Sequence, residues 1–166
     1  METIGLFFGS TTGNTQDMAE LIAEKMPNPV ELKDVADCSP EDMLSYSGLI
    51  LGMSTWGEGE LQDDWEDFLP DMEDLDLSGK TVALFGLGDS DGYQETFVDA
   101  LGIVYEKVVA CGAKVVGSWP TDGYSFDGSA AVVDGKFAGL VLDVDNEGHK
   151  SEERITAWVE QISSSF

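Results

Sequence analysis

Basic residues are scarce in this chain of 166 residues: 8 lysines and arginines stand against 33 aspartates and glutamates, a formal net charge of −25. Such a surface repels polyanions, so the composition argues against nucleic acid and anionic membranes as partners. A protein with a basic face would instead be attracted from a distance and would associate quickly. The charge therefore favours basic protein partners.

Cysteine and long apolar runs are also lacking. Cys38 and Cys111 are the only cysteines, and they form neither a Cys-x-x-Cys motif nor a disulfide framework. No apolar run approaches the length of a membrane span, and no signal-peptide pattern is present. Because the length suits one domain, residues 1–166, we expect a monomeric, single-domain cytoplasmic protein without membrane insertion.

Histidine is nearly absent, which bears on catalysis. His149 is the only one, and it lies in a polar stretch, so we expect it to be exposed. No serine or threonine has a base close to it in sequence, which leaves no candidate catalytic residue. The ten acids from Glu58 to Asp76 lack the spacing of an EF-hand, so no metal is expected. We therefore expect no enzyme, and we interpret the acids as a solvated face that also suits docking.

Apolar stretches alternate with amphipathic ones in the pattern typical of an α/β protein. Because the apolar stretches are almost continuous, both faces of the sheet should be covered. We predict a doubly wound five-stranded parallel sheet of order 2-1-3-4-5, with helices on both faces and an insertion in strand five. The expected strands are 2–9, 30–35, 49–54, 81–88 and 114–118 with its continuation 139–144 after the insertion 119–138. The expected helices are 15–26, 97–112 and one that Ser151 caps.

The stretch from Gly9 to Thr15 joins the first strand to the first helix. In such a loop, backbone N–H groups and the helix dipole favour an anion. Four hydroxyls add donors, and Gly9 and Gly13 let the backbone approach a ligand closely. A P-loop for magnesium nucleotides needs a lysine where Asn14 stands, so a terminal monophosphate suits this loop better. The alternative is a Ser/Thr-rich turn with an ordinary N-cap.

Two further loops, 54–61 and 88–96, are expected to leave the same edge of the sheet. Each has one large aromatic residue among glycines, Trp56 in the second loop and Tyr93 in the third. Two such rings form a slot for a flat ligand, although single loop aromatics more commonly cover the edge of the core.

Polar groups in the same two loops suit a redox ring. Asp89 can accept a hydrogen bond from a ring N–H, or it can form an Asx turn. The Gly57-Glu58 peptide can rotate without a Cβ clash and offer a carbonyl to a ring nitrogen that gains a proton. Gly57 is otherwise a simple turn residue.

Taken in order and spacing, these motifs resemble the long-chain flavodoxins over essentially the whole chain. Two of the motifs, around residues 123–126 and 139–146, flank the insertion in strand five. The motifs are Ser10-Thr11-Thr12-Gly13-Asn14-Thr15, Thr55-Trp56-Gly57-Glu58-Gly59-Glu60-Leu61, Gly88-Asp89-Ser90-Asp91-Gly92-Tyr93, Gly123-Tyr124-Ser125-Phe126 and Gly139-Leu140-Val141-Leu142-Asp143-Val144-Asp145-Asn146.

The resemblance implies one non-covalent flavin mononucleotide (FMN). The first loop would bind its phosphate, Trp56 and Tyr93 would sandwich the isoalloxazine, and the Gly57 carbonyl would meet the protonated N5. Asp89 would lie near N3, and Asp145 near the ribityl chain. The implied cofactor-binding set is Ser10, Thr11, Thr12, Gly13, Asn14, Thr15, Ser54, Thr55, Trp56, Gly57, Glu58, Gly59, Leu87, Gly88, Asp89, Tyr93 and Asp145.

One departure from the family pattern concerns the ring edge. Thr96 and Val98 stand where other long-chain members often carry amides, so contacts from these positions are not implied.

The resemblance further implies a low-potential one-electron carrier that shuttles FMN between semiquinone and hydroquinone. Its acidic surface would dock basic redox partners. Two other classes share related folds. A two-electron flavin reductase would need a substrate cleft, usually at an oligomer interface, and a phospho-acceptor receiver domain would need an acidic pair where Ser10, Thr11 and Thr12 stand.

Overall fold

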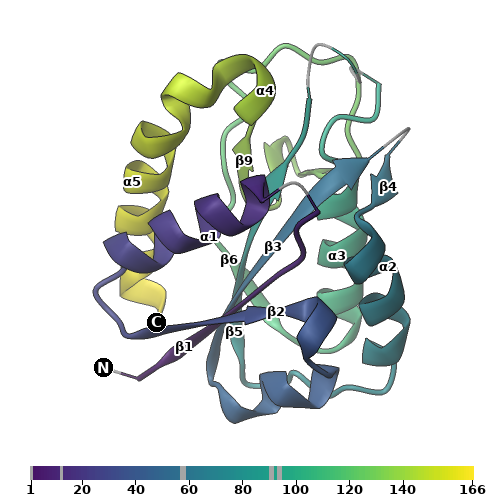
Figure 1. The fold of residues 1–166 in the computed structure, drawn as a ribbon, viewed down its shortest axis with the longest axis vertical. Coiled ribbons are helices and arrows are strands. Elements are labelled where there is room, and N and C mark those ends of the chain that lie inside the picture. The colour runs from purple at the N-terminus through teal and green to yellow at the C-terminus, as the bar shows by residue number, and fades with distance from the viewer. Residues whose placement is uncertain (1, 12, 57–58, 90–91, 93–94) are drawn as a thin grey trace.

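The fold is a parallel sheet between two layers of helices (Figure 1). A computed structural model describes residues 2–11, 13–56, 59–89, 92 and 95–166. The strand order β2-β1-β3-β5-β6 confirms the predicted order, with all these neighbours parallel. The strands are β1 (Ile4–Phe8), β2 (Val30–Asp34), β3 (Gly48–Trp56), β5 (Thr81–Leu87), β6 (Lys114–Val116) and β9 (Leu140–Leu142).

The fifth position of the sheet is shared by two strands, as the predicted insertion requires. β6 pairs with Thr81–Ala83 at the start of β5, and β9 pairs with Phe85–Leu87 at its end. The chain leaves the sheet after β6 and returns to the same line at β9. The predicted interruption of strand five is therefore confirmed.

Two small pairings add to this sheet. Within the insertion, β7 (Val132–Val133) and β8 (Lys136–Phe137) form an antiparallel hairpin. Its turn residues Asp134 and Gly135 both have positive φ, at 54° and 83°, which is the geometry that a two-residue hairpin needs. Near the second loop, β4 (Glu60–Leu61) pairs antiparallel with the end of β3.

Helices cover both faces (Figure 1). On one face lie α1 (Asn14–Lys25) and α5 (Ser151–Ile162), and on the other lie α2 (Asp63–Phe68) and α3 (Asp99–Ala110). A short α4 (Val144–Glu147) precedes α5, and 3-10 turns span 35–37, 40–45, 69–72, 148–150 and 163–165. No helix among the described residues has the length and hydrophobicity to cross a bilayer.

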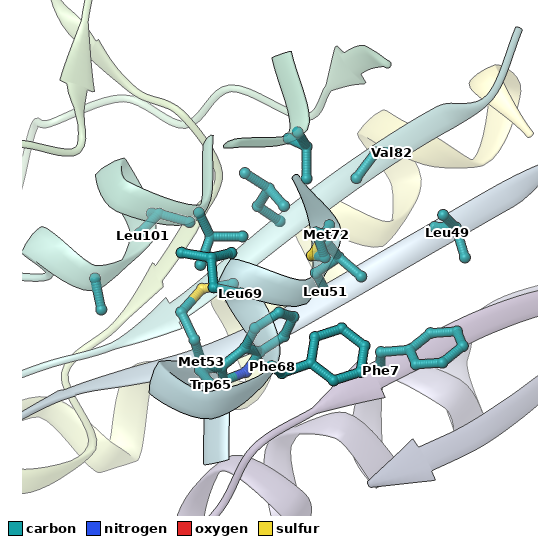
Figure 2. Close-up of a cluster of buried hydrophobic side chains, with 14 of the residues drawn as sticks. Phe7, Leu49, Leu51, Met53, Trp65, Phe68, Leu69, Met72, Val82 and Leu101 are labelled. Atoms are coloured by element: carbon teal, nitrogen blue, oxygen red, sulfur yellow. The ribbon is translucent and has the colours of Figure 1, made fainter. Parts of the chain in front are cut away.

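The central strands supply both cores, because successive side chains point to opposite faces. In β1, Phe7 packs toward α2 and α3, whereas its neighbours Leu6 and Phe8 pack toward α1 and α5. Figure 2 shows the first core, where Trp65 and Phe68 of α2 lie against Met53 and Leu51 of β3. The near-continuous apolar strands are explained by this two-sided burial.

The expected N-cap at Ser151 is wrong. Ser151 already has helical geometry, with φ −60° and ψ −47°, because the 3-10 turn of 148–150 runs directly into α5. Its hydroxyl is buried and has no hydrogen-bond partner among the described residues. The capping side chain of this region is Asp143, which accepts from the Asn146 N–H at the start of α4.

Tyr124 fastens the insertion to the sheet. Its hydroxyl donates to the Val141 carbonyl at 2.5 Å and accepts from Trp119 Nε1 at 2.9 Å. The Arg154 guanidinium of α5 lies 4.2 Å from the ring centroid, a cation–π contact. Burial raises the pKa of Tyr124 to about 12.

Tyr124→Phe is expected to lower the free energy of unfolding at pH 7 by about 1–2 kcal/mol, because a buried carbonyl and an indole N–H lose their partner. In the wild type, the raised pKa stabilises the fold fully below pH 10, and this contribution of about 2–3 kcal/mol is lost as the pH rises toward about 12. Denaturant unfolding at pH 7 to 12 should therefore show a shallower alkaline decline in the variant. Tyr105→Phe is the control, and an equal decline in wild type and Tyr124→Phe would contradict the assignment.

Candidate functional site

The carboxyl ends of β1, β3 and β5 lie at one edge of the sheet, where doubly wound folds bind their ligands. The three loops singled out by the sequence leave from these ends. Thr12, Gly57, Glu58 and Tyr93 lie outside the described residues, so their predicted roles remain predictions. The other predicted residues can be placed.

The first loop ends in a helix start without a capping side chain. Gly13 occupies the N-cap position of α1 with φ +92°, so the first N–H groups of this 12-residue helix have no side-chain acceptor from the N-cap. A Cβ at Gly13 would meet nothing within 4 Å, so the space beside it is open to a ligand. The alternative of a turn with an ordinary Ser or Thr N-cap is therefore not what the structure shows.

Side chains of this loop divide into two groups. Ser10 Oγ accepts a hydrogen bond from the Gly13 N–H at 3.1 Å, which closes the loop. Thr11 is exposed, Asn14 is half-buried as the first residue of α1, and Thr15 is buried with 2% exposure. Ser10 and Thr11 thus present hydroxyls at the loop, whereas Thr15 packs inside the helix start.

The second loop begins with an indole held in place. Trp56 is 40% exposed, and its Nε1 donates to Ser54 Oγ at 2.8 Å. Thr55 Oγ1 accepts from the Ala100 N–H at 3.0 Å, so this hydroxyl oxygen binds the first turn of α3. Gly59 has φ +88°, and a Cβ there would lie 2.7 Å from Asp99 Oδ2. The loop is thus seated against α3 and presents a fixed aromatic face.

The third loop is tied to α4. Asp89 Oδ1 accepts from the Gly92 N–H at 2.9 Å, consistent with the turn role, and from Asn146 Nδ2 at 2.8 Å. Gly88 N donates to the Leu142 carbonyl at 3.2 Å. Leu87 is buried, so its side chain belongs to the core. The backbone of Asp145 lies in α4 beside Asn146, and its side chain is outside the described part of the chain.

Val98 is a core residue beside the third loop. Its side chain is fully buried, and its φ of +49° places it at the N-cap of α3. A Cβ on Gly88 would lie 2.7 Å from Val98 Cγ1, so the absence of a side chain at Gly88 makes this packing possible. Thr96 is half-buried. Position 98 therefore contributes to the core next to the third loop.

Sequence reasoning missed two amides that connect these loops. Asn146 links Asp89 to the buried Asp143, and Gln62 links Thr11 to the start of α2. Both are polar residues in or beside short helices, which is a weak signal in a single sequence. Their roles follow from contacts between segments far apart in the chain.

The acids of the second loop and of α2 that the structure describes form no ion pair. The ion pairs found in the described part of the chain join Lys25 to Glu152 and both Lys150 and Arg154 to Glu147, all on the other face of the sheet. On α2, Asp63, Glu66 and Asp67 are exposed. The acidic face therefore projects a net negative potential beside the first loop.

A doubly wound sheet with an open helix start and an exposed indole at its carboxyl edge defines an α/β protein whose ligand-binding edge suits a phosphate and a flat ring. A family model described as Flavodoxin matches residues 6–158. The chain therefore belongs to the flavodoxin family, whose members are electron-transfer proteins rather than enzymes.

Relatives and solved structures agree with this membership. Flavodoxin of Helicobacter pylori is 49% identical over 100% of this chain and 99% of the relative, and flavodoxin of Synechocystis sp. is 48% identical over 98% and 96%. A Fusobacterium nucleatum flavodoxin solved with bound flavin mononucleotide superposes with a TM-score of 0.95 at 32% identity, covering 100% and 99% of the two chains. These alignments span both halves of the split strand and the insertion between them.

Proposed function

We propose that this protein is a cytoplasmic low-potential one-electron carrier that binds FMN without a covalent bond and works between its semiquinone and hydroquinone states. The observation that carries the proposal is the open, uncapped start of α1 beside two hydroxyls, in a loop without any cation. Such a loop suits a terminal monophosphate held by neutral donors. The exposed face of Trp56 at the same edge suits the flat ring of a flavin.

The flavin supplies the electron chemistry when bound, and the protein orients and tunes it. Trp56 would cover one face of the ring, its rotamer fixed by the bond to Ser54. The predicted second face, Tyr93, and the predicted carbonyl of Gly57 complete the proposed slot. The turn formed by Asp89 would hold the third loop at the ring edge through Asn146.

The charge of the site supports a low potential. A like charge about 10 Å from an added electron, at an effective dielectric of about 20, opposes it by about 1.7 kcal/mol, or about 70 mV. The exposed acids of α2 have no ion-pair partner in the described part of the chain, so several such terms would add before salt screens them. The same acids leave few sites for an anionic partner and favour a basic one.

A reductive titration followed by visible absorbance tests this proposal. The purified protein should be yellow, should pass through a blue neutral semiquinone, and should release FMN rather than a dinucleotide on denaturation. A protein that goes from oxidised to fully reduced without the blue intermediate would instead be a two-electron flavoprotein. A colourless protein that cannot take up FMN would refute the proposal.

Docking through α2 predicts a salt-dependent rate. Replacing Asp63, Glu66 and Asp67 by their amides should slow electron transfer to a basic c-type cytochrome at low salt and flatten the dependence on ionic strength. The physical reason is the loss of steering charge on one exposed face. The measurement is a stopped-flow rate from about 10 to 500 mM salt.

A matched variant separates local charge from net charge. Glu20, Glu24 and Glu160 are equally exposed, but lie on α1 and α5 across the sheet, and their amides remove the same number of charges. This control should keep a steep salt dependence. Equal flattening in both triple variants would place docking outside α2.

A further inference from the structure

Gln62 is a buried amide whose bonds join α2 to the first loop. Its side chain is only 1% exposed although it stands at the N-cap of a surface helix. Nε2 donates to Thr11 Oγ1 at 2.9 Å and to Asp64 Oδ2 at 2.8 Å, and Oε1 accepts from the Trp65 N–H at 3.4 Å. Both N–H hydrogens of this amide and one lone pair of its oxygen are therefore used, and the bond to Thr11 spans 51 residues of sequence.

The orientation of the amide is determined by Asp64. A carboxylate only accepts hydrogen bonds, so the amide must turn its NH2 group toward Asp64 and its oxygen toward the Trp65 N–H. The flipped amide would set two oxygens against each other and leave a buried N–H without an acceptor. The second hydrogen of the NH2 group consequently points at Thr11.

This bond determines what the Thr11 hydroxyl can do. A hydroxyl has one hydrogen and two lone pairs, and here one lone pair is occupied by Gln62. The hydrogen is left to donate elsewhere, and Thr11 is exposed on the loop. In a loop without Lys or Arg, an oriented O–H donor is what an incoming phosphate oxygen needs.

Gly9 makes this arrangement sterically possible. A Cβ at Gly9 would lie 2.3 Å from Gln62 Oε1 and 2.6 Å from Trp65 Cδ1, too close for any side chain. The amide is thus wedged between the end of β1 and α2 and cannot rotate freely. Little rotational freedom would remain to be lost when a ligand binds.

We propose that Gln62 is a positioning residue for FMN: oriented by Asp64, it holds Thr11 as a hydrogen-bond donor aimed at the phosphate. The inference rests on the proposed FMN function and adds that α2, the acidic helix, sets the shape of the phosphate site. Gln62 itself acts through Thr11 and is not placed in contact with the flavin.

Gln62→Glu tests this, with FMN and riboflavin as the two probes on the full-length apoprotein. The variant keeps the size of the side chain and an acceptor for the Trp65 N–H, but it loses both donated hydrogens. FMN affinity should fall about tenfold, while riboflavin, which has no phosphate, should change less than about twofold. Equal losses for both ligands, or no loss for either, would overturn the proposal.

A pH profile adds a readout that a purely structural role would not move. The introduced carboxyl lies buried beside Asp64, so its pKa should be raised. Below that pKa it regains an O–H that can donate to Thr11, and FMN affinity relative to wild type should recover as the pH falls. A variant-to-wild-type ratio that stays constant with pH would contradict the proposed donor.

Asp64→Ala and Asp63→Ala keep the test decisive if Gln62→Glu folds poorly. Both remove one negative charge near the phosphate loop, but only Asp64 bonds the amide. Asp64→Ala should weaken FMN several-fold, whereas Asp63→Ala should not weaken it; equal effects would overturn the proposal. A wild-type protein that prefers riboflavin or binds both alike would instead refute the proposed phosphate site.

Discussion

Phe137→Ala is expected to lower the free energy of unfolding by about 3–5 kcal/mol, the cost of truncating a fully buried ring. Phe137 lies at the centre of an aromatic cluster, with ring centroids 5.3 Å from both Tyr124 and Phe126 and 6.1 Å from Phe97. Its backbone pairs with Trp119 in both directions, at 2.8 and 2.9 Å. Phe137 therefore joins the hairpin to the start of the insertion through its backbone, and to the segment that precedes α3 through its ring.

FMN affinity should survive this loss, because none of the residues that contact Phe137 in the cluster belongs to the predicted binding set. Urea unfolding of the apoprotein measures the stability, and fluorescence titration with FMN measures the affinity of the folded fraction. Phe126→Ala, on a half-buried ring of the same cluster, should cost less. A variant that unfolds normally but loses FMN would show that the insertion contributes to the cofactor site.

Replacing residues 119–138 by a short turn is also expected to leave FMN bound. The structure shows which contacts the turn would remove. Ala130 N donates to Asp99, and the Ala130 carbonyl lies where a Cβ of Gly102 would come within 2.3 Å. The insertion is thus packed closely on α3, so we expect a large stability cost even if the flavin stays bound.

The central strands were predictable from the sequence because they are buried on both faces. β3 and β5 read as continuous apolar runs, which is the pattern expected of strands in a parallel sheet covered on both sides. The insertion was predictable as an interruption, but its hairpin was missed although Asp134-Gly135 between apolar residues is a strong turn signal. The hairpin leaves little alternating pattern in the sequence, because β7 and β8 are only two residues long each.

For the candidate site, the sequence predicted which loops lie together and no more. Loop positions follow from topology, which places the carboxyl ends of parallel strands together. The bonds of Gln62 and Asn146 depend on side chains meeting across the fold, and no local pattern encodes them. The prediction of an N-cap at Ser151 was wrong for a related reason. A helical turn precedes α5, so the N–H groups that a cap would bind are not free there.

Trp65→Ala should also cost about 3–5 kcal/mol of unfolding free energy, but with a second effect at the phosphate loop. The indole is fully buried, donates to the Gly52 carbonyl at 2.7 Å, and lies edge-to-face with Phe68 at 5.4 Å. It also fills the space beside Gly9, from which the loop begins. Truncation would leave a cavity beside Gly9 and remove a side chain that packs next to Gln62.

The informative quantity is the ratio of riboflavin to FMN dissociation constants, because it cancels effects on the ring and on the folded fraction. Phe137→Ala, at equal stability cost, should keep the wild-type ratio, whereas Trp65→Ala should lower it. Trp65→Phe refills most of the cavity but lacks the indole N–H, so its ratio should lie between those of the two alanine variants. The Gly52 carbonyl would still accept a hydrogen bond from the Gly9 N–H, at 3.2 Å. An unchanged ratio in Trp65→Ala would mean that the first loop keeps its shape without the Trp65 indole. That result would also count against the role inferred for Gln62.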